Sequence, residues 1–416
     1  MFKMKYKNYD SALKNEDEPI AFVLSRYATT GLGVTRCLGR LGVPVVWLDS
    51  NPNQAGFLSK YCRGIVCPEP KNKEEEYVDF LLSIGKKLSK KGVLLPAGDV
   101  EVFAILKNRS KLEKYYHIPM ADLDVTEKLL NKRIFYKTLE EQNVPHPSTY
   151  FLRSKSELEE ISKKISYPCI LKPSISDRFR LDFVTKVFKA DSSEQLIHFY
   201  DKAFSRNHDV IIQEIVPGGA KNMYGLNAYY DKVGNPNGIF MYRRIREWPH
   251  DFGNGCAIES VYVPELEEII DPVIKKINYR GIVDAEFKKD SRDGKFKLIE
   301  INARCWMQIG LPARCGVNIP YIAYKDAIGK NVEKAIYNKK HVKWFYMYED
   351  ILSSLKSMLK SEFSFHEWTD SFRGEKEYAI FARDDLLSCP VFYAYRPIFL
   401  LQQFFQRHRR REEKKL

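Results

Sequence analysis

The amino-acid sequence predicts a mixed α/β protein, with a parallel sheet near the N-terminus followed by an α+β region. In the N-terminal part, short apolar runs alternate with helical segments, which is typical of βαβ units. Further along, two runs of alternating polar and apolar residues flank a turn at residues 290–294, which indicates a hairpin. Because the chain has 416 residues, we expect two or three domains.

Composition narrows the class of protein. Hydrophobic residues make up 44% of the chain and charged residues 29%, which are globular values. No uninterrupted apolar run is long enough for a membrane-spanning helix, and the basic start lacks the apolar core of a secretory signal. The eight cysteines include no Cys-x-x-Cys pair, so we expect a reduced, cytoplasmic chain. The net charge of +13 suits nucleic acid, anionic lipid or an anionic small molecule, but no nucleic-acid-binding motif supports the first.

The first βαβ unit is predicted from a strand at residues 20–25, a helix at 34–41 and a strand at 44–48. Residues 26–33 contain Gly31 and Gly33 and are expected to form a loop. The third glycine of a dinucleotide fingerprint would fall at Arg36, so a dinucleotide site is not favoured.

A further strand is predicted at residues 92–96, and two acids, Asp99 and Glu101, follow it. Open α/β sheets bind ligands at the carboxyl ends of their strands, so these acids are candidates for a site. Acids are also favoured in the first turn of a helix, and this second interpretation stays open.

The next region begins near residue 123. Its predicted helices and strands cover residues 126–143, 157–165, 169–173, 193–204 and 210–214. The strand at 169–173 carries Lys172, and the strand at 210–214 carries Glu214. A charge on a buried strand is costly unless it is paired or bound to a ligand, although either residue alone also fits a strand edge.

The hairpin carries a row of polar side chains on one face. A turn centred near residue 293 places Glu286 opposite Glu300 and Asp284 opposite Asn302. Facing carboxylates repel each other unless a cation lies between them. Carboxylate and amide oxygens suit Mg²⁺ or Mn²⁺ bridged to phosphate, and Arg304 supplies a positive charge for a phosphoryl group. The alternative is an amphipathic hairpin with one solvated face.

The order of these motifs resembles the ATP-grasp superfamily over about residues 20–330. The motifs are Lys132, Lys172-Pro173, Gln213-Glu214, Asp284-Ala285-Glu286 and Glu300-Ile301-Asn302-Ala303-Arg304. Within the superfamily the chain looks most like the carboxylate–amine ligases related to D-aspartate ligase. That subgroup's pattern is matched at residues 213–219, 243–246 and 252–255.

The resemblance implies the domain organisation. Residues 1–18 would be a basic and polar tail, and residues 19–122 a Rossmann-like pre-ATP-grasp domain. Residues 123–330 would form the two-subdomain ATP-grasp domain with the nucleotide and metal site. Residues 331–416 would form a helical and strand extension that ends in an apolar and basic tail.

The resemblance also implies roles for individual residues. The ATP phosphates would be contacted by Lys132 and Lys172, and adenine would be bound near Gln213, Glu214 and Val216. One or two Mg²⁺ ions would be held by Glu286, Glu300 and Asn302. The substrate carboxylate or an acyl phosphate would be bound by Arg304 with Arg243 or Arg244.

The implied reaction activates a carboxylate with ATP as an acyl phosphate, which an amine then attacks to give an amide, ADP and phosphate. The chain departs from the family in its flap, residues 173–183, which contains no glycine. Arg178, Arg180, Ser174 and Ser176 are candidate substitute donors to phosphate. The alternative is a nucleotide-binding homologue with weak or lost turnover.

In the C-terminal stretch we expect helices at residues 356–360 and 365–372 and a strand from Tyr378 that ends in Asp384 and Asp385. The segment 391–416 is apolar and then strongly basic, which suits peripheral contact with an anionic membrane. A helix docked on the core with a solvated basic end is the alternative. A basic membrane or anion-binding module is therefore a third functional class.

The expected partners are a small-molecule carboxylate and an amine, with no nucleic acid. The expected location of the protein is the cytoplasm, or the inner face of the membrane. The sequence leaves the oligomeric state open.

Overall fold

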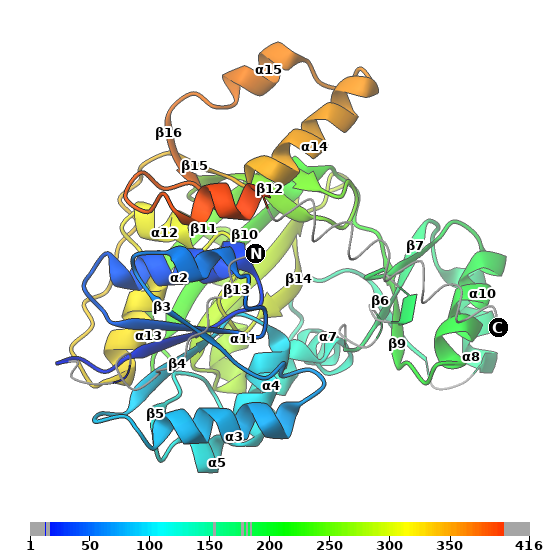
Figure 1. Ribbon diagram of the computed structural model, residues 1–416. Helices are drawn as coiled ribbons and strands as arrows, with labels where there is room; N and C mark the ends of the chain where they lie inside the picture. Colours follow the sequence, from blue (N-terminus) through cyan, green and yellow to red (C-terminus); the bar gives the residue numbers. More distant parts are fainter. Residues whose placement is uncertain are drawn as a thin grey trace, which may run out of the picture.

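The computed structural model describes residue 13 and residues 17–394, apart from positions 153–154, 176–178, 180–181 and 184. Its strands form three sheets, of five, seven and four strands. In Figure 1 the five- and seven-stranded sheets lie together in the main body, and the four-stranded sheet stands to one side. The mixed α/β fold is the one that the sequence predicts.

The N-terminal sheet is parallel and has the strand order β3-β2-β1-β4-β5. Its strands are β1 (Ala21–Leu24), β2 (Val45–Asp49), β3 (Arg63–Val66), β4 (Gly92–Pro96) and β5 (Tyr116–His117). The helices between them are α2 (Ala28–Gly39), η1 (Ala55–Leu58), α3 (Glu74–Gly85), α4 (Asp99–Lys107) and α5 (Arg109–Leu112). Both faces of β1 are buried, because Ala21 and Val23 pack in one core cluster and Phe22 and Leu24 in another. The three predicted strands are confirmed to within one residue.

Helix α2 begins at Ala28, so the expected loop over residues 26–33 is wrong beyond its first two residues. Gly31 and Gly33 lie inside the helix and allow close packing there. A Cβ atom on Gly31 would lie 2.0 Å from the ring of Trp47, and one on Gly33 would lie 2.7 Å from Ile309. These glycines are therefore packing positions and do not form a phosphate-binding loop.

The single helix expected at residues 126–143 is wrong, because the structure has two, α6 (Leu123–Leu130) and α7 (Lys132–Glu141). They are separated by Asn131, whose side-chain oxygen accepts hydrogen bonds from the backbone N–H groups of Arg133 and Ile134 at 3.1 and 3.4 Å. This N-cap begins a new helix and places Lys132 in its first turn.

The four-stranded sheet has the order β6-β9-β7-β8 and is antiparallel. Its strands are β6 (Thr149–Phe151), β7 (Cys169–Pro173), β8 (Phe188–Ala190) and β9 (Val210–Glu214). Two helices, α8 (Lys155–Lys164) and α10 (Ser193–Phe204), pack with it in a separate core cluster (Figure 1). This unit brings Lys172 and Gln213 onto neighbouring strands.

The seven-stranded sheet has the order β14-β13-β10-β11-β12-β15-β16 and is antiparallel except at its β15–β16 end. Its strands are β10 (Met223–Tyr230), β11 (Pro236–Trp248), β12 (Asn254–Val261), β13 (Gly281–Lys289), β14 (Phe296–Asn302), β15 (Val342–Phe345) and β16 (Glu375–Tyr378). The remaining helices are η2 (Ala220–Asn222), α11 (Glu265–Ile277), α12 (Gly310–Arg314), α13 (Ile319–Ala327), α14 (Met347–Leu359) and α15 (Phe365–Asp370). The predicted hairpin is the β13–β14 pair.

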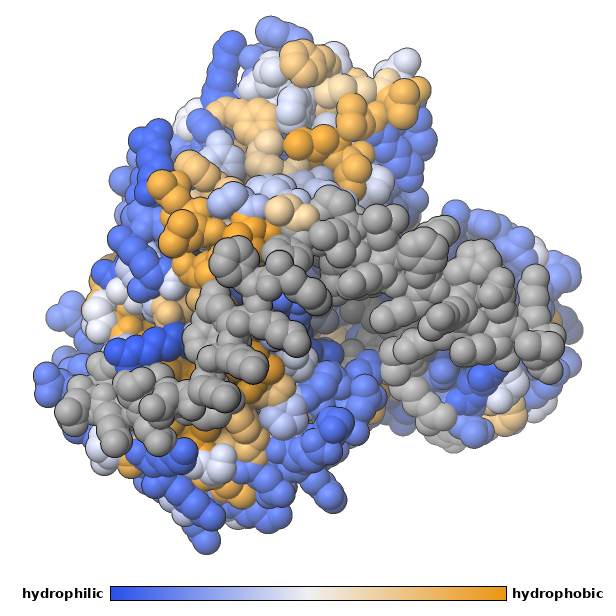
Figure 2. Space-filling view, viewed as in Figure 1, coloured by the Kyte–Doolittle hydropathy of each residue, from blue (hydrophilic) through white to orange (hydrophobic). Residues whose placement is uncertain are grey.

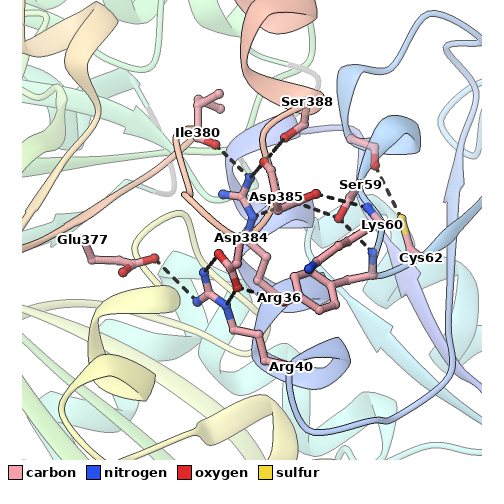
Figure 3. Close-up of polar contacts among 12 residues, drawn as sticks. Arg36, Arg40, Ser59, Lys60, Cys62, Glu377, Ile380, Asp384, Asp385 and Ser388 are labelled. Carbon is pink, nitrogen blue, oxygen red and sulfur yellow. Dashed lines mark hydrogen bonds and ion pairs between the residues drawn. The ribbon is translucent and has the colours of Figure 1, made fainter.

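The C-terminal extension returns to the N-terminal sheet. The two helices predicted there are present as α14 and α15, but the strand ends at Tyr378, where it was expected to begin. The reason is visible in Figure 3, where the segment after Tyr378 contacts Arg36 of α2. The Arg36 guanidinium donates to the Ile380 carbonyl oxygen at 2.8 Å and to Asp385 Oδ2 at 2.9 Å.

These contacts form a cluster that we call the C-terminal clasp: Arg36, Ser59, the Lys60 backbone N–H, Ile380, Asp385 and Ser388. The side chains of Arg36 and Asp385 are 3% and 1% exposed. Beside the cluster, Arg40 pairs with Asp384 at 2.8 Å in a far more exposed position. The clasp joins the extension to the first sheet (Figure 3).

Exposed apolar side chains gather on the upper part of the molecule in Figure 2. They include Ile351, Leu355 and Leu359 on α14 and Phe365 on α15. Within the described part of the chain, no helix combines the length and the apolar character needed to cross a membrane. The tail predicted to contact a membrane lies outside the described residues from position 395 on.

Candidate functional site

The β13–β14 hairpin has the predicted register. Asp284 pairs with Asn302 and Glu286 with Glu300, and a bulge follows Glu286. The Asp284 carboxylate accepts hydrogen bonds from Asn302 Nδ2 at 3.1 Å and from Asn227 Nδ2 of the adjacent β10 at 2.8 Å. Burial, followed by repulsion from Glu286, raises the pKa of Asp284 to about 7.

The two glutamates of the hairpin have different electrostatic surroundings. Burial raises the pKa of Glu286, although Arg244 Nη2 donates to its Oε2 at 2.6 Å. Burial would also raise the pKa of Glu300, but nearby cations outweigh it and lower that pKa. These cations are Lys132, Lys172, Lys186 and Arg304. Glu300 therefore lies where positive side chains from several elements converge.

Lys172 lies on β7, is 5% exposed, and donates from Nζ to the hydroxyl oxygen of Tyr136 at 3.0 Å. Burial and then Lys132 lower its pKa to about 7, against the opposing effect of Glu300. A buried lysine next to a second lysine is an unfavourable arrangement in the free protein. It becomes favourable when a multiply charged anion lies between the two cations.

Tyr136 connects this region and was not singled out from the sequence. Its hydroxyl donates to the Ile299 carbonyl oxygen of β14 and lies 3.5 Å from Gln213 Oε1. Gln213 in turn donates from Nε2 to Thr149 Oγ1 at 2.7 Å. A tyrosine inside an amphipathic helix reads as a core residue, so the sequence carried no signal for its position between two sheets.

Glu214 occupies a different environment from Gln213. Its carboxylate accepts from Lys297 Nζ at 2.6 Å, Arg292 Nη2 at 2.9 Å and the Ser148 backbone N–H at 3.0 Å. Val216, two residues further on, is buried. The structure thus holds Glu214 against the hairpin turn through two ion pairs.

Arg304 joins the hairpin to the first sheet. Its Nε donates to Asp99 Oδ1 at 2.5 Å, and its Nη2 donates to Asn302 Oδ1 at 3.2 Å. Asp99 follows β4 and lies in the first turn of α4, as the helix interpretation has it, and a role for this acid in a site stays a prediction. Glu101 lies in the same first turn and accepts from Arg26 Nε at 2.9 Å.

The structure separates the two candidate arginines of β11. Arg244 is 5% exposed and contacts Glu286 and Glu247. Arg243 pairs with Glu259 instead. Adjacent strand residues point to opposite faces, so Arg243 lies away from Glu286 and Glu300.

Most of the predicted site residues lie close together in the structure. They are Lys132, Lys172, Arg244, Glu286, Glu300, Asn302 and Arg304.

In the flap, Ser174 donates from Oγ to Asp209 Oδ2 at 2.5 Å, so its hydroxyl is held by a carboxylate. Ser176, Arg178 and Arg180 lie outside the described residues. Lys186 follows just after the flap and donates to Asn254 Oδ1 at 3.1 Å. Its charge acts to lower the pKa of both hairpin glutamates, Glu286 and Glu300. Lys186 is a site residue that the sequence alone did not reveal.

The oxygen atoms of the hairpin fit a hard divalent cation. Glu286, Glu300 and Asn302 offer carboxylate and amide oxygens, the ligands that Mg²⁺ prefers. Beside them, Asn227 Oδ1 is buried and has no hydrogen-bond partner. No group of three or more His, Cys, Asp or Glu side chains arranged around a metal position occurs in the described part of the chain. A cation held here would therefore depend on amide oxygens as well as on the two glutamates.

Comparison with known proteins gives a family match over part of the chain and two solved structures with the same fold. Residues 244–348 match the family described as "ATP-grasp in the biosynthetic pathway with Ter operon". The fold is shared with N5-carboxyaminoimidazole synthetase from Staphylococcus aureus, with a TM-score of 0.62 at 13% identity over 84% of this chain and 87% of that one. It is also shared with L-amino acid ligase from Bacillus licheniformis, with a TM-score of 0.56 at 14% identity over 77% and 76% of the two chains. The fold is therefore the ATP-grasp fold, as the sequence predicts.

A sequence relative gives a more particular likeness. D-aspartate ligase from Enterococcus faecium is 26% identical over 271 residues, which are 62% of this chain and 64% of that protein. The chain thus matches slightly less than two thirds of that relative's length. The predicted resemblance to the ATP-grasp ligases is confirmed.

Proposed function

We propose that the protein is an ATP-dependent carboxylate–amine ligase. The observation that supports this most directly is the convergence of Lys132 and Lys172 on Glu300, which faces Glu286 across the hairpin. Cations from two elements and a carboxylate pair make up a site for a phosphate chain with its counter-ion. The relatives named as D-aspartate ligase and L-amino acid ligase make amide formation the proposed outcome.

In the proposed reaction, a carboxylate oxygen of the first substrate attacks the γ-phosphate of ATP. The bond to the β-phosphate oxygen breaks, and ADP leaves. An amine then attacks the acyl phosphate carbon and expels phosphate, which gives the amide. The protein contributes position and charge, since phosphoryl transfer needs no protein nucleophile.

Individual side chains have defined parts in this proposal. Lys132 and Lys172 hold the phosphates, and Arg304 and Arg244 bind the substrate carboxylate or the acyl phosphate. Adenine binds near Gln213, Glu214 and Val216, at the end of β9, which pairs with the strand that carries Lys172. Arg243 is the weakest of the proposed residues, because it pairs with Glu259 on the other face of the sheet.

Glu286, Glu300 and Asn302 are the residues that would hold Mg²⁺, which neutralises phosphate charge when bound. Asn227 is a further candidate, because its Oδ1 is buried and has no partner. Arg244 pairs with Glu286 at 2.6 Å and offsets part of the charge of that carboxylate.

The test is release of ADP from ATP in the presence of pools of amino acids and other small amines. We expect one acid and amine pair to raise ADP release well above background. Glu300→Gln keeps the shape of the side chain but removes its charge, and it should lower kcat by at least about a hundredfold. Binding of ATP without a rise in ADP release for any pair would instead favour a nucleotide-binding homologue that has lost turnover.

A matched control is Glu333→Gln, which makes the same chemical change at an exposed position outside the site. This variant should turn over like the unmodified protein. Normal activity in Glu300→Gln would overturn the assignment of the site.

The proposed partners are a small-molecule carboxylate and an amine. Contact between the segment 391–416 and an anionic membrane, with residence in the cytoplasm, stays a prediction. The membrane contact is tested by deleting 391–416 and measuring sedimentation with anionic liposomes. Equal binding with and without the segment would remove it.

A further inference from the structure

A cavity of about 320 Å³ lies between the first sheet and the seven-stranded sheet. Lys91, Arg109 and His117 line it from the N-terminal unit, and Lys232 and Arg280 line it from the larger sheet. Lys91 precedes β4, whereas Asp99 follows that strand. The cavity is therefore at the opposite edge of the parallel sheet from Arg304 and the hairpin site.

The acidic side chains of the cavity do not balance its cations. Glu113 pairs with Arg109, which also lies 3.0 Å from Asp122. The carboxylate of Asp326 accepts a hydrogen bond from the Tyr229 hydroxyl at 2.6 Å. Lys91 donates from Nζ to the carbonyl oxygen of Glu113 at 2.8 Å, which is an uncharged partner. In the described part of the chain, no carboxylate pairs with Lys232 or Arg280.

His117 reports the electrostatic field inside the cavity. Its pKa is lowered by burial and then by Lys91 and Lys232, which approach from opposite walls. Lysines from both sides of the cavity thus act on the same histidine.

We propose that this cavity is a second anion site that binds a phosphate-bearing small molecule, separate from the nucleotide site of the hairpin. Lys91, Lys232 and Arg280 are the side chains whose charge the ligand offsets. The volume suits a small ligand with one or two phosphate groups.

The position of the site links two parts of the molecule. Met120 forms a β-bridge with Gly281, and the Ala121 backbone N–H donates to the Arg280 carbonyl oxygen at 2.8 Å. A bound anion would therefore contact both sides of the junction between the first sheet and the seven-stranded sheet. Binding of an anion in this cavity does not require that the protein is a ligase.

The experiment measures the pKa of His117 by NMR, with ¹³C-labelled histidine in the full chain at constant ionic strength. Inorganic pyrophosphate and glycerol 3-phosphate are the probes, and tighter binding of one or the other distinguishes free polyphosphate from a phosphate ester. We expect either probe to raise the pKa of His117 by about half a unit or more, because an anion favours the imidazolium. No response of His117 to either probe, or an equal response to sodium chloride, would overturn the proposal.

Variants of the cavity test which cations bind the anion. Lys232→Ala should raise the pKa of His117 in the free protein, since it removes a neighbouring charge, and weaken pyrophosphate binding at His117 about tenfold. Arg280→Gln serves as a second variant if the first does not fold. Lys276→Ala, an exposed lysine of α11, is the matched control and should change neither quantity. Unchanged affinity in both cavity variants would contradict the proposal.

Discussion

At the scale of single residues, Lys172 has the most informative environment in the candidate site. It is buried beside a second lysine, and its pKa is lowered to about 7. In the free protein at pH 8 the Lys172 side chain is therefore mostly the neutral amine. An anion at the site favours the charged form and raises the pKa, so that binding takes up a proton.

We therefore predict that ATP binding weakens as the pH rises above about 7, by up to about tenfold per pH unit until the pKa of the bound state is reached. Below pH 7, Lys172 is already charged and contributes no further pH dependence. Calorimetry between pH 7 and 9 in buffers with different ionisation enthalpies measures the proton uptake.

Lys172→Arg provides the comparison, because arginine keeps its charge across this range. The proton uptake should be lost in this variant. Uptake that persists unchanged would assign the titrating group elsewhere.

Residue-level chemistry was predictable where the pattern was local. The alternation of Asp284 and Glu286, and of Glu300 and Asn302, fixed which side chains share a face, and the turn at residue 293 fixed their register. Tyr136 and Lys186 were not predictable. Each reaches the site from a segment distant in sequence, and neither stands in a pattern that distinguishes it from a packing or surface residue.

At the scale of elements, the break between α6 and α7 determines where Lys132 lies. Asn131 caps α7 through two backbone N–H groups, and Lys132 follows directly. The backbone N–H of Lys132 donates to the Ser174 carbonyl oxygen at 3.0 Å, so the start of α7 is also tied to the end of β7.

Asn131→Ala removes the cap and should lower the free energy of unfolding by about 1 kcal/mol. It should also weaken ATP binding, because the first turn that carries Lys132 loses its anchor. Asn131→Asp retains a capping oxygen and is expected to unfold like the unmodified protein. Denaturant unfolding and calorimetric titration measure the two effects, and equal stability of the alanine variant would contradict this role of Asn131.

The break was missed because the residues around Asn131 all tolerate a helix, and a continuous helical pattern runs across it. The start of α2 was missed for a related reason. Glycine is unfavourable inside a helix, so Gly31 and Gly33 indicated a loop. The contacts with Trp47 and Ile309 that require these glycines exist only in the folded chain.

At the scale of the whole molecule, the C-terminal clasp holds the extension against the first sheet. Its central ion pair joins Arg36 and Asp385 at 2.9 Å, and both side chains are almost fully buried. Removal of one partner leaves a buried charge without compensation.

Asp385→Ala should lower the free energy of unfolding by about 3–5 kcal/mol. Asp384→Ala provides the control, since that residue pairs with Arg40 in a position where both side chains are more than a third exposed. This second change should cost at most about 1 kcal/mol. Equal losses for the two variants, measured by denaturant unfolding, would show that the clasp is not the stronger contact.

The clasp was beyond sequence-based prediction, because no local pattern connects two residues 349 positions apart. The overall fold class was predictable because it follows from the order of strands and helices along the chain. The return of the extension to α2 is a long-range contact, and such contacts are specified by packing in the finished structure.

The clasp also has a consequence for the order in which the chain assembles during synthesis. Helix α2 is translated before the extension, and Asp385 follows 349 residues after Arg36. At about 5–20 residues per second, the ribosome needs roughly 17–70 s to supply that carboxylate. Until then the Arg36 guanidinium lacks its carboxylate partner. The burial of the Arg36 charge against the extension is therefore a late event in synthesis, after residues 36–385 have been made.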